Sequence, residues 1–415
     1  MHVVIVGAGI IGIQTAHALL DDGHAVTLVD PDGLGQRTSR GNAGGIVHVD
    51  ILPLASPKVW REIPRWLIDP LGPFSIRPSY ALAILPWLLG FVRASTPAQV
   101  ERSTQALIAL NGASIGAWER RLGKLGLVQK HLRPLGYACV FSSKPQFEAA
   151  LPTLQRQEKL GYRLELLTDH AAVKKLEPAL GPAAVAAANY PAGVNVDDPA
   201  SVTLALGEQA IARGAKLVRG EVAGVTRAAT GVETRLSSGQ TIASDMAVIA
   251  AGAWSRPLCA GLGDDVPLDT ERGYNLTLPR GSLGLSRMIL FEGEGFVTTP
   301  LDIGDRLGGA VEFGGLSLPP NYKRVDAMVA RAKRFLPDAK FEGGTRWMGF
   351  RPSLPDTLPV ISTASRTDRV IYAFGHAHHG LTQSAITAEL VGALVARRPP
   401  SLSLEPFDVR RFRTR

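Results

Sequence analysis

The first thirty residues contain the pattern that most limits how this chain can fold. Residues 2–6 are an apolar run rich in β-branched side chains, which predicts a buried strand. A Gly-x-Gly-x-x-Gly pattern follows, then a helical segment at 13–20, then a second apolar run at 25–29 that ends in an acid. Strand, glycine turn, helix, strand and acid in this order predict the first βαβ unit of a domain that binds a dinucleotide.

Each glycine of this pattern has a physical function. Gly7 allows the sharp turn, Gly9 lets backbone amides approach a diphosphate, and Gly12 lets the helix pack close to the strand. The helix begins near Ile10 and Ile11, where unpaired N–H groups and a partial positive charge favour phosphate. These five residues are therefore predicted to hold the diphosphate of a cofactor.

The acid, Asp30, lies where a carboxylate accepts hydrogen bonds from a ribose diol, which disfavours the 2′-phosphate of NADP and leaves NAD and FAD. Residues 198–220 predict a helix entered through Asp198-Pro199 and then a strand. A glycine turn at 237–239 and an apolar strand at 247–254 follow. Flavoproteins use a hairpin of this kind to cover the adenosine half of FAD, whereas an NAD dehydrogenase continues with regular βα repeats. FAD is the cofactor that we expect.

Seven motifs extend this pattern along the whole chain. They are the fingerprint at 7–30, TSRGNAGGI at 38–46, EVAGV at 221–225, AAGAW at 250–254, RGY at 272–274, GFRPSLPDTLPVI at 349–361 and GHAHHGLTQ at 375–383. In this order the chain resembles the D-amino-acid oxidase family of flavoenzymes, and most of all its D-amino acid dehydrogenase branch. Glycine oxidase, sarcosine oxidase and bacterial D-hydroxyproline dehydrogenases are similar proteins.

The resemblance implies an α/β fold with a Rossmann-like FAD-binding domain of discontinuous segments and a substrate domain with a mixed or antiparallel sheet. We expect the FAD-binding domain at 1–50, 195–260 and 345–415, and the substrate domain at 51–194 and 261–344. The strand pattern at 136–141 fits either domain.

The resemblance also assigns residues to the cofactor. Those implied along the diphosphate and the flavin edge are Ser39, Asn42, Ala43 and Gly44, those implied near the adenine and ribose are Val222, Ala251 and Gly252, and those implied at the flavin pyrimidine edge are Gly380, Leu381 and Thr382. The last three begin a predicted helix at 381–396, whose N-terminus would stabilise the negative charge of the reduced flavin. For Asn42 an Asx turn is the alternative.

Three histidines in GHAHHGLTQ raise the question of a metal site. His378 and His379 are adjacent and so are expected to point differently, and no HExxH pattern completes a set of ligands. We therefore expect no metal, and treat the histidines as loop residues of which one, His376, faces the substrate pocket.

Further substrate-site candidates follow from the resemblance. Arg351, in the Arg-Pro element, is implied to bind the substrate carboxylate as a bidentate fork, the alternative being a surface arginine before a turn. Arg346 ranks below it. Tyr274 is expected to cover the substrate or to pack in the core, and His48 to approach the flavin face. Glu312 is expected at the pocket wall or under the flavin.

The implied reaction transfers hydride from the α-carbon of a D-amino or D-imino acid to flavin N5, giving an imine or a cyclic pyrroline. Positioning of the α-carbon does most of the work, so a dedicated base need not exist. The stretches at 68–80 and 85–95 are similar to proteins of hydroxyproline breakdown, which favours cis-4-hydroxy-D-proline or D-proline. General D-amino acid dehydrogenation and oxygen-dependent glycine or sarcosine oxidation remain alternatives. A quinone or another membrane acceptor is expected to take the electrons.

Composition narrows the partners and the compartment. The net charge of +8 favours anionic partners, but no basic block interleaved with aromatic residues indicates nucleic-acid binding. Two cysteines 120 residues apart and the absence of a signal pattern indicate a reducing, cytoplasmic setting.

The apolar stretch at 80–92 is too short to span a bilayer. It predicts either a buried helix broken by Pro86 or an interfacial helix inserting Trp87, Leu88, Leu89 and Phe91. With the arginine-rich tail, the second alternative implies peripheral contact with the inner face of the cell membrane.

Three rival classes share parts of this pattern: an NAD-dependent dehydrogenase, a protein that holds flavin only structurally, and a flavin-dependent RNA-modifying enzyme. The hairpin argues against the first, and the lack of a basic groove pattern argues against the third.

Overall fold

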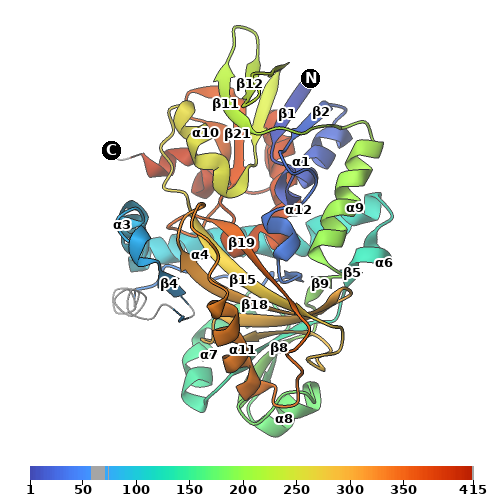
Figure 1. The fold of residues 1–415 in the computed structure, drawn as a ribbon, viewed down its shortest axis with the longest axis vertical. Helices are drawn as coiled ribbons and strands as arrows, with labels where there is room; N and C mark the ends of the chain where they lie inside the picture. Colours follow the sequence, from blue (N-terminus) through green and yellow to red (C-terminus); the bar gives the residue numbers. More distant parts are fainter. Residues whose placement is uncertain (58–70, 73, 414–415) are drawn as a thin grey trace.

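A computed structural model describes residues 1–57, 71–72 and 74–413. Two large sheets divide the molecule, with the parallel sheet and both described chain ends in the upper half of Figure 1 and a larger mixed sheet below. Helices α7, α8 and α11 lie in the lower part of Figure 1, away from the parallel sheet. Part of the stretch at 68–80 and the last two residues of the arginine-rich tail fall outside the described residues.

The parallel sheet has the strand order β10-β2-β1-β14-β21-β20. Its bounds are β10 Lys216–Val218, β2 Ala25–Val29, β1 His2–Val6, β14 Met246–Ile249, β21 Thr367–Phe374 and β20 Val360–Ala364. All pairs are parallel except β20 with β21. The apolar runs predicted as strands are buried on both faces, as a covered parallel sheet requires.

Helices cover one face of this sheet and a small sheet covers the other. Val3 and Ile5 of β1 pack with the helix layer, whereas Val4 and Val6 pack with the opposite layer. The helices are α1 Ile10–Asp21, α12 Gly380–Val395, α9 Pro199–Ala212, α4 Pro97–Gly112, α5 Ser114–Lys124 and α6 Val128–His131. The opposite layer consists of β11 Val222–Arg227, β12 Val232–Leu236, β13 Thr241–Ser244 and α10 Ser255–Gly261. The hairpin expected here is thus a three-stranded antiparallel meander.

The start of α9 confirms the capping prediction. The Asp198 carboxylate accepts a hydrogen bond from the Ser201 amide at 2.8 Å, and Pro199 occupies the first turn. An acidic N-cap followed by proline satisfies an amide that the helix itself cannot pair.

The mixed sheet has nine strands in the order β19-β15-β18-β17-β16-β6-β8-β7, with β4 paired to β18. Its bounds are β19 Thr345–Ser353, β15 Asp269–Leu278, β18 Gly304–Phe313, β17 Phe296–Leu301, β16 Met288–Phe291, β6 Tyr137–Phe141, β8 Ala186–Tyr190, β7 Glu165–Leu167 and β4 Phe74–Ile76. Among the described strands of this sheet, only β16 with β6 and β18 with β4 pair in parallel. The helices beside it are α7 Lys144–Lys159, α8 His170–Leu176 and α11 Lys323–Phe335.

A second small sheet lies between the two halves. It has the order β3-β9-β5, and its strands are β3 Gly45–Ile46, β9 Val194–Val196 and β5 Leu132–Arg133. These short strands come from three separate chain crossings between the domains.

The strand at 345–353 differs from the sequence expectation, which assigned it to the FAD-binding domain. β19 pairs with β15 along its length, from Asp269 opposite Ser353 to Thr277 opposite Thr345. Backbone pairing of this extent places it in the mixed sheet, and the chain returns to the parallel sheet at β20. The strand predicted at 136–141 is β6 of the mixed sheet.

The apolar stretch at 80–92 forms α3, Leu85–Ala94, with Pro86 in its first turn, where proline is tolerated. Trp87 and Phe91 stack with ring centroids 4.9 Å apart and are buried against Phe313. Of the two alternatives, the buried helix is confirmed for these two rings and their insertion into a membrane surface is wrong, because they fill a core between α3 and the mixed sheet. Among the described residues, none of the helices has the length and apolarity needed to span a bilayer.

Candidate active site

A cavity of about 850 Å³ lies between the parallel sheet and the mixed sheet. It begins at the carboxyl ends of β1 and β2, passes the N-terminus of α12, and ends against β15, β18, β19 and the β16–β17 turn. Ligands of open α/β sheets bind at the carboxyl ends of the strands, so the first part of this cavity is where a dinucleotide is expected.

Two glycines of the fingerprint are required by close packing. Gly7 has φ +107°, and a Cβ there would lie 2.4 Å from the carbonyl oxygen of Ala250. A Cβ at Gly12 would lie 2.0 Å from the carbonyl oxygen of Gly7. The turn and the helix contact therefore exclude any side chain, as the sequence predicted. Gly12 itself does not line the cavity.

Asp30 is held rigidly at the end of β2. One carboxylate oxygen accepts from the Ala8 amide at 2.9 Å, and the other accepts from the amides of Asp32 at 2.9 Å and Gly33 at 3.0 Å. Three backbone donors orient the carboxylate beside the cavity, which it lines. Such an oriented acceptor suits a ribose diol.

The α1 N-terminus faces the same cavity and suits a diphosphate. A helix leaves its first amides without intrahelical partners, and here the Ile10 amide donates to Ser39 Oγ at 3.0 Å. Gly9, Ile10, Ile11 and Ser39 all line the cavity. A Cβ at Gly9 would crowd Ser39 Oγ at 3.3 Å and occupy the approach to the amides.

Most of the residues that the resemblance assigned to FAD are brought together. Those that line the cavity are Asn42, Ala43, Val222, Ala251, Gly252, Gly380, Leu381 and Thr382. Gly44 does not line it. The Asn42 side chain accepts from the Gly44 amide at 2.8 Å, so the Asx turn is present and Asn42 also faces the cavity. The α12 helix begins at Gly380, and its N-terminus supplies amides and a positive partial charge to the middle of the cavity. The residues present thus fit FAD.

Arg351 lies at the far end of the cavity. Its two terminal nitrogens donate to the carbonyl oxygens of Ala310 at 3.0 Å and Gly309 at 3.4 Å, and it makes no ion pair with any described residue. Burial lowers the pKa of the guanidinium, and the carboxylate of Glu271 on the neighbouring strand partly offsets this. A desolvated cation with unused donors is a site for an anion.

Tyr274 also lines the cavity, but its hydroxyl is already engaged. It donates to Glu312 Oε2 at 2.7 Å and accepts from the Asn321 amide at 3.0 Å, and burial raises its pKa to about 12. Glu312 in turn pairs with Arg272 at 3.1 Å and does not line the cavity, contrary to its expected place at the pocket wall. The Tyr274 ring can cover a substrate, while its hydroxyl is used in hydrogen bonds within the protein.

Replacing Tyr274 with phenylalanine tests this division. We expect Tyr274→Phe to lower the free energy of unfolding by about 1–3 kcal/mol, because Glu312 and the Asn321 amide lose a partner in a buried place. The KM for the substrate should change less than threefold. Chemical denaturation and steady-state kinetics measure the two effects, and a large rise in KM with unchanged stability would contradict the assignment.

His48 and His376 have different surroundings. His48 lies 3.3 Å from the Tyr137 hydroxyl, packs edge-on against Tyr162 and does not line the cavity, so its expected approach to the flavin face is not seen. His376 lines the cavity, but burial lowers its pKa to about 3 and its Nε2 lies 3.0 Å from Thr387 Oγ1. His376 is therefore neutral and holds α12 in place.

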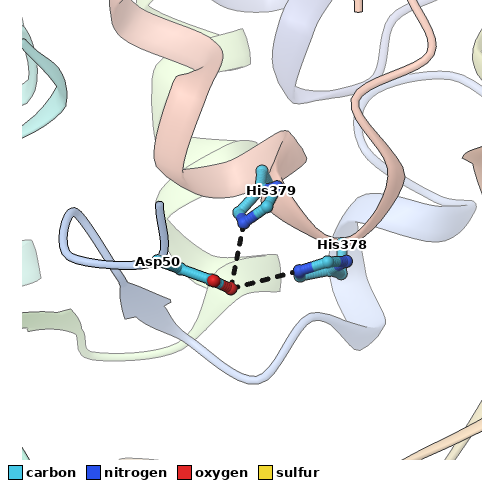
Figure 2. Close-up of side chains that lie close together, drawn as sticks. All are labelled: Asp50, His378 and His379. Carbon is cyan, nitrogen blue, oxygen red and sulfur yellow. Dashed lines mark hydrogen bonds and ion pairs between the residues drawn. The ribbon is translucent and has the colours of Figure 1, made fainter. Parts of the chain in front are cut away.

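Asp50, His378 and His379 form a cluster that the sequence did not indicate. Both histidines direct Nε2 at the same Asp50 oxygen, at 3.2 Å from His378 and 3.1 Å from His379 (Figure 2). The expectation that adjacent histidines point differently is wrong, because the short turn before α12 folds both rings toward the loop that carries Asp50. All three residues line the cavity.

Comparisons with known proteins agree with this geometry. The profile of the DAO family, described as FAD dependent oxidoreductase, matches residues 2–394. The D-amino-acid oxidase of Bradyrhizobium diazoefficiens is 36% identical, with 99% of each chain covered. The D-amino acid dehydrogenase 2 of Ralstonia nicotianae is 28% identical, covering 99% of this chain and 100% of that one. The crystal structure of glycine oxidase from Geobacillus kaustophilus has the same fold, with a TM-score of 0.79, 22% identity and 99% of each chain covered.

The family profile covers nearly the whole chain, from the glycine fingerprint to the end of α12. Its cofactor fits the cavity that those elements enclose. The chain belongs to the DAO family of FAD-dependent oxidoreductases, and FAD is its cofactor.

Proposed function

We propose that this protein oxidises the Cα–N bond of a D-amino or D-imino acid, giving an imine or a cyclic pyrroline. The observation that carries the proposal is Arg351, a guanidinium without an ion-pair partner among the described residues, facing the end of a cavity that fits FAD. Two relatives that the chain is similar to over nearly its whole length are named for D-amino acids.

The substrate end of the cavity suits a small carboxylate. A bidentate fork fixes both the position and the orientation of a carboxylate, which a point charge cannot do. Gly273 leaves room for the guanidinium, since a Cβ there would lie 2.4 Å from its central carbon. FAD, when bound, supplies the two-electron acceptor for hydride from the substrate α-carbon. The task of this chain is to hold that carbon in reach and to exclude water.

Within this class we favour a cyclic substrate, cis-4-hydroxy-D-proline or D-proline. The support is the sequence likeness at 68–80 and 85–95 to proteins of hydroxyproline breakdown. General D-amino acids and glycine- or sarcosine-type amines are the competing substrates.

For the electron acceptor we propose a quinone or another membrane carrier, as in the dehydrogenases that the chain resembles. A second candidate, oxygen, is favoured by the 36% identity to a protein named as an oxidase. Contact with an anionic membrane surface would accompany the first candidate and not the second.

One experiment separates these choices. The purified holoenzyme is mixed anaerobically with cis-4-hydroxy-D-proline, D-proline, D-alanine, glycine and sarcosine in turn, and loss of flavin absorbance is followed. We expect the cyclic D-imino acids to bleach the flavin fastest. The reduced enzyme is then mixed with oxygen or with a quinone analogue, and we expect reoxidation by the quinone to be faster. A yellow protein that none of these compounds bleaches would refute the proposed substrate class.

A further inference from the structure

The cluster of Asp50, His378 and His379 has no part in the function proposed so far. Burial alone would raise the pKa of the Asp50 carboxyl, but the hydrogen bonds from His378 and His379 outweigh burial and hold that pKa well below its usual range. Asp50 is therefore ionised. A carboxylate has no proton to give, so each histidine donates Nε2–H to it, and the lone pair of each ring lies on Nδ1.

The two rings differ in their access to the cavity. The His379 side chain is 2% exposed, and its Nδ1 is buried without a hydrogen-bond partner in the described part of the chain. The His378 side chain is 33% exposed and lines the cavity. His378 is thus the ring of the two that a bound molecule can reach.

His378 lies in the same part of the cavity as Arg351, the residue proposed to bind the substrate carboxylate. The turn Ala377–His379 contacts β19, the strand that carries Arg351. Glu271, which lies opposite Arg351 in the sheet, also acts electrostatically on His379. An α-amino acid bears its carboxylate and its ammonium group on one carbon. When Arg351 binds the carboxylate, the ammonium group lies within the same part of the cavity.

We propose, on the basis of the function proposed above, that His378 accepts the proton of the substrate's α-ammonium group and that Asp50 is the positioning residue that orients the ring. In this step an N–H bond of the ammonium breaks, its electron pair stays on the amine nitrogen, and the proton forms a bond to His378 Nδ1. The step involves no change of oxidation state. The free amine lone pair is needed before hydride leaves the α-carbon, because that lone pair becomes the C=N bond of the imine.

The same three side chains also offer ligand atoms of the kind that divalent metals bind. A metal-bound histidine nearly always donates its second ring N–H to a carboxylate, a carbonyl or water. His379 has no such acceptor at Nδ1. A proton-accepting pair of Asp50 and His378 does not require an acceptor at Nδ1 of His379, whereas a metal site would. His378 faces the cavity, as such a pair requires.

Other ionisable groups face this cluster and influence its titration. From the neighbouring elements these are Glu271 of β15, Glu292 of the β16–β17 turn, His376 before the turn, Tyr137 and Cys139 of β6, and Tyr190 of β8. Among them, burial raises the pKa of Glu292, and the Asp50 charge adds to this. Because all of these groups remain in every variant described below, differences between variants report on His378 and Asp50.

The test is the pH dependence of anaerobic flavin reduction in the holoenzyme, with the amino or imino acid that bleaches the wild type. A ring that already carries a proton cannot accept another, so the wild-type rate should fall as the pH falls. In His378→Gln we expect a loss of about 100-fold at neutral pH. At a pH where the substrate amine is deprotonated in solution, the variant should approach the wild type.

Two more variants and one control sharpen the result. Asp50→Asn removes the carboxylate that orients the ring and pairs with its protonated form, so the loss of rate in this variant should depend on pH and not be equal at every pH. Added imidazole should restore reduction in His378→Ala, which also shows that this variant is folded. His170→Gln changes a histidine on α8, outside the cavity lining, and should keep the wild-type profile.

Several outcomes would overturn the proposal. They are a wild-type pH profile in His378→Gln, a loss of rate equal at every pH, or stoichiometric zinc whose removal abolishes the pH dependence. A wild-type enzyme that no amino or imino acid reduces would refute the proposed function itself, which is a different result from these.

Discussion

Replacing Arg351 with alanine is expected to lower the second-order rate constant of flavin reduction by roughly 100-fold to 1000-fold. The guanidinium supplies both the charge and the paired donors for the substrate carboxylate, and it has no ion-pair partner in the described residues that would compete. Arg351→Lys keeps the charge but loses the fork, so we expect an intermediate loss of about tenfold. Stopped-flow absorbance with D-proline or the best substrate measures both.

Arg346 provides a matched control on the same strand. It forms an exposed ion pair with Asp326 at 2.6 Å, far along β19 from the cavity end. Exposed pairs contribute about 0–1 kcal/mol, so Arg346→Ala should change the rate less than twofold. All three variants should keep the flavin spectrum of the wild type, because none of the substituted residues lies at the dinucleotide end. Equal losses in Arg346→Ala and Arg351→Ala would contradict the assignment of the carboxylate site.

Replacing Gly7 with alanine is expected to yield protein without FAD. Gly7 has φ +107°, and the new Cβ would lie 2.4 Å from the Ala250 carbonyl oxygen, so β1 and β14 must separate at the place where they meet the cofactor. Left-handed backbone alone costs a non-glycine residue about 1–3 kcal/mol, and the overlap adds to this. The ratio of flavin to protein absorbance after gel filtration, and the thermal midpoint, measure the effect.

Gly23 provides a control that separates the effect of backbone strain from the effect of atomic overlap. It also has positive φ, +75°, but a Cβ there would meet nothing within 4 Å. Gly23→Ala should therefore lower stability by about 1 kcal/mol and keep the full amount of FAD. Gly7→Ala protein that is as yellow and as stable as Gly23→Ala would refute the packing argument.

The dinucleotide half of the site could be predicted because its determinants are local. Gly7, Gly9, Ile10 and Asp30 lie within one βαβ unit. At each position the local backbone conformation explains why that residue serves the site. The start of α12 could be predicted in the same way, from a glycine-bounded loop between an apolar strand and an apolar helix.

The substrate half could be predicted only in part. The Arg-Pro motif pointed to Arg351, but the strand that carries it was expected in the FAD-binding domain and pairs with β15 of the mixed sheet. Nothing local in 345–353 specifies that pairing. Tyr274 was identified as a cavity residue, yet its hydroxyl is engaged by Glu312 on the neighbouring strand. A strand pattern predicts the face of the sheet on which a side chain lies, but it does not predict the hydrogen-bond partner of its hydroxyl.

By itself the sequence determined the βαβ fingerprint, the cofactor, the family resemblance and the arginine proposed to bind the carboxylate. Only the tertiary structure decided that Asp50 meets His378 and His379 at one oxygen, across a separation of 328 and 329 residues. The reason is physical. Turns, caps and glycine packing are set by neighbouring residues, whereas a hydrogen-bonded cluster depends on how the fold brings loops from distant parts of the chain together. The spacing of these residues in the sequence does not indicate that contact.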